Sequence, residues 1–433
     1  LQALDGNTAT LAGNYALADD ILAASTASAN GGLGFNPIGN EATASLSAAN
    51  SFTGRFQGFG HTISDLTINR PGSQSTGLFA SAINARIDNL VLTNAAVTGS
   101  RYVGSLVGAA QQATLITNVQ STATAISSVD SNSGGVYAGG LVGAIGSGSG
   151  AALNRVSTTG TVSGDTNTAT AMLGGVIGQM DIGTITAATS SAGVTATLRA
   201  GSTNNTNFLV GGIAGSFSGG NLTNLTASGA VAGGWHSGGL VGRFAPTTGT
   251  LTGGQASGNV SSTGTAGGLV GYATGTGLIQ NSDATGTVFT SGAETVAAYA
   301  GGAVGQYAMT LAPSAVSAAG NVTGGNVTGG VIGWYQTNQA LGAGSVVSVA
   351  PVGAPKEVNG PRWVGGVVGY SDSTAAMSGL SYVGNVTATG SAGSAGGISG
   401  RTLAGVSNST SSGQVSGLGD VGGLVGRAEG SGG

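Results

Sequence analysis

The sequence predicts an all-β fold, a parallel β-solenoid of about 11–12 coils, on the strength of three observations. Glycine supplies 86 of the 433 residues, whereas charged residues make up only 6%. A five-residue motif, Gly-(Gly/Ser)-apolar-apolar-Gly, recurs along the chain. The segments between its copies are short and rich in β-branched residues, which argues for strands and against helices.

Composition excludes several other classes of protein. Disordered chains combine few apolar residues with many charges, but this chain is 40% hydrophobic. Glycine has no three-residue period and proline occurs only 7 times, which excludes collagen. No run of 18 apolar residues occurs, so we expect no membrane-spanning helix. The 11 basic and 15 acidic residues leave a net charge of −4, which is too dilute for nucleic-acid binding.

The spacing of the motif indicates stacked coils. Copies start 26–37 residues apart, and each repeat holds about three short β-prone segments. One repeat would form one coil, with strands about 4.8 Å from their counterparts, and insertions would bulge from the corners. A β-propeller is the weaker alternative, because its blades are usually longer and carry four antiparallel strands. The copies begin at Gly104, Gly139, Gly174, Gly211, Gly238, Gly267, Gly301, Gly329, Gly365, Gly396 and Gly422.

Alternation along a strand predicts which motif side chains are buried. In the copy Gly139–Gly143, we expect Leu141 to face the core, because its position is apolar in every copy. Val142 would then point outward or lie under another layer, since the equivalent position admits Ala214 and Ser399.

The first hundred residues have a different character, which predicts two parts: a solenoid start over 1–101 and a repeat solenoid over 102–433. Ten of the 26 charged residues lie in the first part. It also contains five of the nine phenylalanines, which predicts a firmer aromatic core there. These are Phe35, Phe52, Phe56, Phe59 and Phe79.

Three segments of this first part carry a family resemblance. Leu17–Ile21, Gly34–Gly39 and the block Phe52–Ile68 resemble the opening of the repeat region in filamentous-haemagglutinin-like bacterial adhesins of the two-partner secretion type. The Gly-Gly-Leu-Val-Gly copies resemble the GLUG motif of such proteins. A departure is Gln57, where these proteins commonly have Asp. The resemblance implies a right-handed β-solenoid on the bacterial cell surface.

Few residues are suited to catalysis or metal binding. We expect His61 to be a structural turn histidine and His236 to lie exposed on a glycine-flanked loop. Two histidines so far apart make a metal site improbable. The acidic residues are scattered, with Asp19-Asp20 the only doublet, and the sole lysine is Lys356. We therefore expect no enzyme, no cofactor and no metal.

A candidate binding surface comes from the residue that directly follows the last glycine of each motif copy. In the early copies this residue is Ala109, Ala144, Gln179 or Ser216. In the later copies it is Arg243, Tyr272, Gln306, Trp334, Tyr370, Arg401 or Arg427. If the coils stack in register, the later set forms an exposed stripe that could stack on sugar rings or on a partner. Shielding of a glycine-rich corner is the alternative interpretation.

The function expected from these observations is mechanical. The chain would be a non-enzymatic extracellular β-solenoid, the stalk or fibre of a surface adhesin, that contacts glycans or neighbouring protomers along Arg243, Tyr272, Trp334, Tyr370, Arg401 and Arg427. The alternatives are a self-assembling filament subunit, which would make the chain a homo-oligomer, and a polysaccharide-active β-helix enzyme. No nucleic-acid partner is expected.

Overall fold

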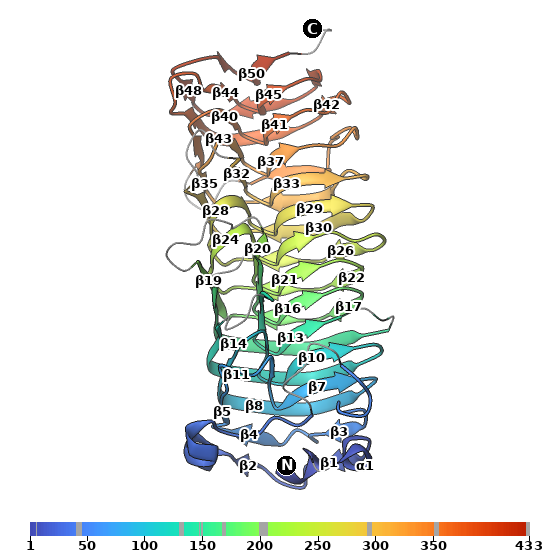
Figure 1. Ribbon diagram of the computed structural model, residues 1–433. Coiled ribbons are helices and arrows are strands. Elements are labelled where there is room, and N and C mark those ends of the chain that lie inside the picture. Colours follow the sequence, from blue (N-terminus) through green and yellow to red (C-terminus); the bar gives the residue numbers. More distant parts are fainter. Residues whose placement is uncertain are drawn as a thin grey trace. The chain divides into compact units, whose positions relative to one another are not determined.

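The computed structural model describes residues 1–5, 7–39, 46–129, 134–146, 148, 150–166, 170–198, 207–291, 297–349 and 355–429. It divides into unit 1, Leu1–Asn221, and unit 2, Leu222–Gly433. In each unit, successive turns of the chain stack as rungs (Figure 1). The pairings between named strands of the described part are parallel. The predicted parallel β-solenoid is therefore confirmed within both units.

Among the described residues, helix is confined to the start of unit 1. It comprises two short 3₁₀ segments, η1 (Gln2–Asp5) and η2 (Ala24–Gly32), and the single turn α1 (Thr8–Leu11). Asn7 caps α1, because its side chain accepts hydrogen bonds from the backbone N–H groups of Ala9 and Thr10. No helix of the described residues is long and apolar enough to cross a membrane.

Each motif copy joins two strands, which we call the wall strand and the floor strand. The wall strand ends at or just before the motif, and the floor strand begins at the fourth motif residue. In unit 1 the wall strands are β6 (Ser75–Thr76), β9 (Tyr102–Val103), β12 (Val136–Gly139), β15 (Thr170–Gly174) and β20 (Asn207–Gly211). The floor strands of unit 1 are β7 (Phe79–Ile83), β10 (Val107–Gln111), β13 (Val142–Ile145), β16 (Ile177–Met180) and β21 (Ala214–Phe217).

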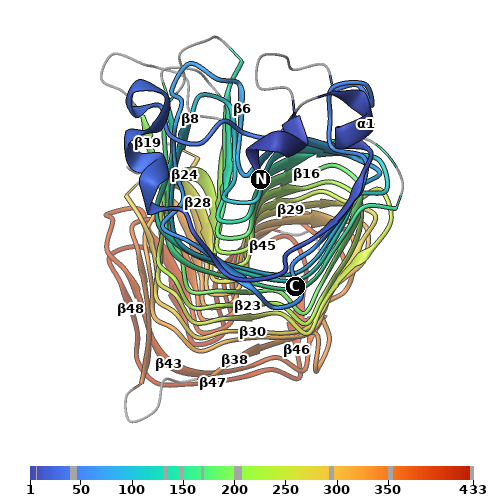
Figure 2. The same cartoon turned by 90° about the horizontal axis from the view of Figure 1, so that it is seen from below.

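Unit 2 repeats this arrangement. Its wall strands are β24 (Val231–Gly238), β28 (Val260–Gly267), β32 (Tyr299–Gly301), β36 (Val327–Gly329), β40 (Trp363–Gly365), β44 (Ser394–Gly396) and β49 (Val421–Gly422). Its floor strands are β25 (Val241–Phe244), β29 (Val270–Gly275), β33 (Val304–Met309), β37 (Ile332–Tyr335), β41 (Val368–Ser371), β45 (Ser399–Thr402) and β50 (Val425–Ala428). Seen along the stack, the wall and floor strands lie next to each other on the inner side of the turn (Figure 2).

The remaining strands complete each turn. In unit 1 they are β1 (Asn14–Ala16), β2 (Ile21–Leu22), β3 (Arg55–Gln57), β4 (Thr62–Ser64), β5 (Thr67–Asn69), β8 (Arg86–Gly99), β11 (Leu115–Val129), β14 (Ala152–Thr166), β17 (Gly183–Thr186), β18 (Thr189–Ser190) and β19 (Gly193–Leu198). The strand β22 (Gly220–Thr223) spans the boundary in sequence. Unit 2 adds β23 (Thr226–Ala227), β26 (Thr250–Thr252), β27 (Gln255–Ala256), β30 (Leu278–Ala284), β31 (Val288–Thr290), β34 (Ser314–Ala318), β35 (Val322–Thr323), β38 (Val346–Ser348), β39 (Lys356–Gly360), β42 (Met377–Ser378), β43 (Ser381–Ala388), β46 (Val406–Ser407), β47 (Thr410–Ser412) and β48 (Val415–Gly417).

The motif glycines allow backbones to approach each other closely. A Cβ on Gly268, the second glycine of its copy, would lie 2.1 Å from the carbonyl oxygen of Gly302 in the next turn. A Cβ on Gly271, the last glycine of the same copy, would lie 2.8 Å from the backbone nitrogen of Ser237 in the preceding wall strand. Both distances are too short for a real carbon atom, so only glycine fits at these positions.

The predicted burial of the motif is half right. Leu141, Leu240 and their equivalents in the inner copies are fully buried, as expected. The outward placement of Val142 is wrong, because Val142 and Val241 have no exposed surface either. Alternation fails because the motif is a corner: the wall strand ends at Gly139 and the floor strand starts at Val142. The two apolar residues therefore belong to different segments of the turn.

The aromatic start of unit 1 is largely as predicted. Phe52, Phe56 and Phe79 are buried. The centroid of the Phe79 ring lies 4.7 Å from that of Phe52 and 5.5 Å from that of Phe56. Phe35 is buried as well, but Phe59 is 67% exposed, so it adds nothing to this core. The predicted change of character at residue 101 stays a prediction.

The core of unit 2 contains the only lysine of the chain. Lys356 is completely buried, and its Nζ donates hydrogen bonds to the carbonyl oxygens of Ala318 and Gly330, at 2.6 and 2.7 Å. Burial lowers the pKa of Lys356 to about 7, because the charged amine loses its hydration. The stability of unit 2 should therefore depend on pH.

Candidate binding surface

The predicted stripe is a continuous column on the floor strands of unit 2, which we call the floor column. Its members pair in register from each floor strand to the next. In order they are Arg243, Tyr272, Gln306, Trp334, Tyr370, Arg401 and Arg427. Arg427 is exposed and the others are partly exposed, so the stacking that the prediction assumed is confirmed. Whether these residues bind a ligand stays a prediction.

A second column faces the first and was not predicted from the sequence. It lies on the wall strands, two residues before the first glycine of each motif copy, and we call it the wall column. Its members also pair in register. In unit 2 they are His236, Thr265, Tyr299, Val327, Trp363 and Ser394. A spacing of seven residues in the sequence is one signal of this column, because the glycine corner brings Trp363 of the wall against Tyr370 of the floor. Other wall residues contact the floor residue of the next turn, as Tyr299 contacts Trp334.

Aromatic side chains of the two columns pack together in the middle of unit 2. The ring centroids of Tyr299 and Trp334 are 4.8 Å apart, those of Trp334 and Tyr370 are 5.9 Å apart, and those of Trp363 and Tyr370 are 4.9 Å apart. Burial raises the pKa of Tyr299 and of Tyr370. Their hydroxyl groups therefore stay protonated at neutral pH and can donate hydrogen bonds.

This aromatic cluster surrounds a cavity of about 240 Å³, which we call the slot. Tyr299, Val327 and Trp363 occupy successive places in the wall column. Val327 lies between these two large rings and is itself only 1% exposed, so its side chain is covered. Trp334 packs against Tyr299 and Tyr370 packs against Trp363, and all four rings line the same cavity.

Arginines lie along one side of the slot. The guanidinium carbon of Arg362 is 4.3 Å from the centroid of the Trp363 ring, and Arg362 also lines the slot. Arg401 contacts Trp363 and Tyr370 in the same way, at 4.4 and 4.8 Å. The charge of Arg401 is engaged by Glu429, which also pairs with Arg427. Arg362 forms no ion pair with any described residue.

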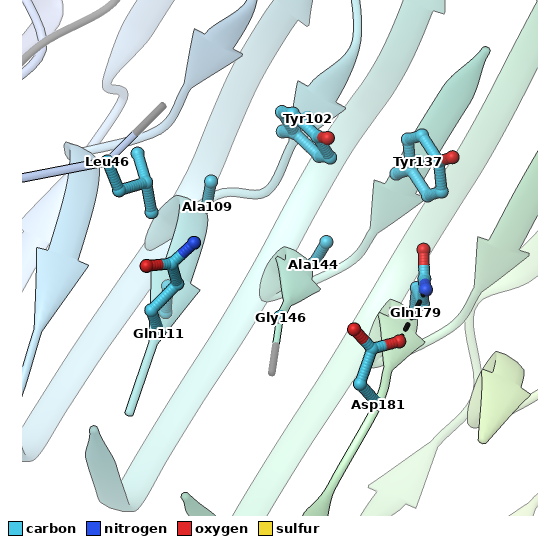
Figure 3. Close-up of a pocket in the computed structure, with 10 residues that line it drawn as sticks. Leu46, Tyr102, Ala109, Gln111, Tyr137, Ala144, Gly146, Gln179 and Asp181 are labelled. Carbon is cyan, nitrogen blue, oxygen red and sulfur yellow. Dashed lines mark hydrogen bonds between the residues drawn. The ribbon is translucent and has the colours of Figure 1, made fainter. Parts of the chain in front are cut away.

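Unit 1 has the same two columns with opposite contents. Its floor column is small at two successive places, Ala109 and Ala144, before Gln179, whereas its wall column carries Tyr102 and Tyr137, whose rings stack 5.0 Å apart. The result is an open groove of about 220 Å³ (Figure 3).

Polar side chains complete the groove of unit 1. Gln111, Gln179 and Asp181 lie across from the two tyrosines, and the Gln179 amide donates a hydrogen bond of 2.6 Å to Asp181 (Figure 3). On the other side of the rings, the guanidinium carbon of Arg101 is 4.9 Å from the centroid of Tyr102. The sequence prediction does not include this groove, because it considers only the floor residues, which are small in the early copies.

The histidines differ from the expectations. His236 lies in the strand β24, where its ring stacks on Tyr272 at 5.1 Å, so its predicted place on an exposed loop is wrong. Burial, reinforced by Arg243, lowers the pKa of His236 to about 4, so its ring is neutral at pH 7. His61 contacts the Asp20 carboxylate at 3.3 Å rather than a turn carbonyl. The described residues contain no cluster of three or more His, Asp or Glu side chains that could hold a metal ion.

Comparison with known proteins agrees with the repeat assignment. Residues 262–288 match the family described as the GLUG motif. Over 141 residues, 31% of this chain, the sequence is 40% identical to Halomucin from Haloquadratum walsbyi (strain DSM 16790 / HBSQ001). The chain spans about 1% of the length of Halomucin. No solved structure matches. The chain is thus a GLUG-motif β-solenoid with a distant relationship to Halomucin.

Proposed function

We propose that this chain is a non-enzymatic extracellular β-solenoid, a stalk or fibre segment of a surface adhesin, which contacts carbohydrate through the slot of unit 2. The observation that carries the proposal is the slot itself, a cavity of about 240 Å³ lined by the rings of Tyr299, Trp334, Trp363 and Tyr370. A flat aromatic face binds the apolar face of a sugar ring, and a tyrosine hydroxyl or amide at the rim binds sugar hydroxyl groups. The slot offers both, from rigid strands.

A shielding role for these side chains does not account for the slot. Shielding of a glycine-rich corner would favour close packing of the large side chains, whereas a cavity of about 240 Å³ remains between them.

The enzyme alternative lacks support at the slot. Glycoside hydrolysis uses two carboxyl groups about 5–10 Å apart, and the described residues that line the slot include no carboxylate. Another cavity in unit 2, of about 410 Å³, contains Asp283 as its single carboxylate among the described lining residues. The Oδ1 atom of Asp283 accepts a hydrogen bond from the Ser317 hydroxyl.

The experiment compares the parent chain with the double variant Trp334→Ala/Tyr370→Ala on a glycan array and by sedimentation. We expect the variant to fold and to lose glycan binding. The control is Trp235→Ala, because Trp235 is the one tryptophan that does not line the slot. Glycan binding that survives in the double variant overturns the proposal. A change in sedimentation alone would instead favour lateral packing of protomers, the filament alternative.

A further inference from the structure

We infer that the slot of unit 2 selects a sugar that carries a carboxylate, such as a uronic acid residue, over its neutral counterpart. This inference rests on the proposed function and adds the chemical class of the ligand. It is carried by the position and the unpaired charge of Arg362.

The guanidinium of Arg362 is placed to meet an anion inside the slot. It lies over the Trp363 ring at 4.3 Å, and such stacking fixes the guanidinium plane. A guanidinium held by its face presents its N–H groups at its edge, in a fork that matches a carboxylate. A sugar ring inserted beside Tyr299 would bring a ring substituent within reach of that edge, because both side chains line the same cavity.

The charges around the slot favour the same ligand. Arg401, the other guanidinium on Trp363, is compensated by Glu429. Arg362 has no carboxylate partner among the described residues, and no described residue that lines the slot is acidic. The charge of Arg362 is thus the one charge among the described residues that line the slot, and a carboxylate would match it. The acidic residue nearby, Asp372, interacts with Trp334 and Tyr370 and forms no ion pair with Arg362 among the described residues.

A neutral hydrogen-bond donor suited to such a ligand also lines the slot. The Tyr299 hydroxyl is protonated at neutral pH, as in any tyrosine, and burial raises its pKa further. A carboxylate can thus bind Arg362 while a sugar hydroxyl group binds the Tyr299 hydroxyl.

The test uses two probes that share a ring and differ in charge: oligogalacturonate and its methyl ester. Binding to the full chain is measured by titration calorimetry. We expect the acid to bind at least about tenfold more tightly than the ester, the difference made by one hydrogen bond to a charged group. The variant Arg362→Gln should remove this preference and leave binding of the ester unchanged. The control Arg155→Gln, an exposed arginine of unit 1 outside both columns, should keep it.

Two outcomes separate this inference from the proposed function. If acid and ester bind equally and Arg362→Gln changes neither, selection for a carboxylate is overturned while carbohydrate binding stands. If neither probe binds, or if both bind the Trp334→Ala/Tyr370→Ala variant as well as the parent, the slot is not the site and both proposals fail.

Discussion

The two units use one motif to build opposite surfaces. In unit 1 the floor column is small at Ala109 and Ala144, and a groove lies open beside stacked tyrosines. In unit 2 the floor column is large, and its rings and guanidinium groups pack on each other and leave only the slot between them and the wall column. The difference teaches that the backbone supplies two facing columns, and that side-chain size alone decides where a cavity forms.

Both units have a buried core, and substitutions in that core should have the largest effect on stability. We expect Val241→Asp to destabilise unit 2 as strongly as Leu240→Asp, by about 3–5 kcal/mol, because each buries an unpaired carboxylate. Leu141→Asp and Val142→Asp should behave alike in unit 1. Urea unfolding followed by circular dichroism measures all four. A mild effect of the two valine variants would restore the outward placement that the structure contradicts.

The close approach of wall and floor should also be common to both units. Gly143→Ala and Gly271→Ala place a Cβ within 2.5 and 2.8 Å of backbone atoms, so each should cost about 1–3 kcal/mol. Gly193→Ala is the matched control, because nothing lies within 4 Å of its Cβ, and it should be neutral or stabilising. Thermal unfolding of the three variants checks this. Equal stability of all three would mean that the corner glycines are not needed for packing.

These two results bear on what the sequence could predict. The interval between motif copies predicts parallel stacking of the coils. Coils stacked in register place equivalent residues side by side, so the floor column follows from the same prediction. The wall column was missed because its meeting with the floor depends on the tight corner, as between Trp363 and Tyr370. The same corner explains the error at Val142, since strand alternation does not continue through a turn. The loop position expected for His236 is wrong because its flanking glycines, which are typical of loops, lie within the strand β24 here.

Unit 2 should differ from unit 1 in its response to pH. Lys356 has a pKa of about 7 when folded, below its ordinary value of 10.5, so between these values the unfolded chain binds a proton that the folded chain does not. Stability should therefore rise from pH 7.5 to 9.5, by up to about 1 kcal/mol per pH unit from this group. Urea unfolding followed by tryptophan fluorescence reports on unit 2, which contains all three tryptophans. Lys356→Met should remove the contribution of this one proton to the dependence of the unfolding free energy on pH. An unchanged dependence on pH would contradict the buried amine of Lys356.

The smallest effect is expected in the groove of unit 1. Ala144→Gln copies the residue at the next place in the same column, Gln179, and extends into open space. We expect a change in stability within about 0.5 kcal/mol. The control Ala110→Gln, one strand position beyond Ala109, forces the same side chain into the core and should be strongly destabilising. If Ala144→Gln is as damaging as the control, the groove is filled in solution.

The central claim is that the slot is a ligand site and not a packing defect, and filling it tests this most directly. Ala297 is exposed and lines the slot, so Ala297→Trp would place a large ring there while every aromatic and arginine side chain remains in place. The measurement is the affinity of the full chain for the glycans that the parent binds, by titration calorimetry. The account predicts that Ala297→Trp stays folded and loses that affinity at least tenfold, about 1.4 kcal/mol. Unchanged affinity would contradict it and leave the cluster as a shield for the corner.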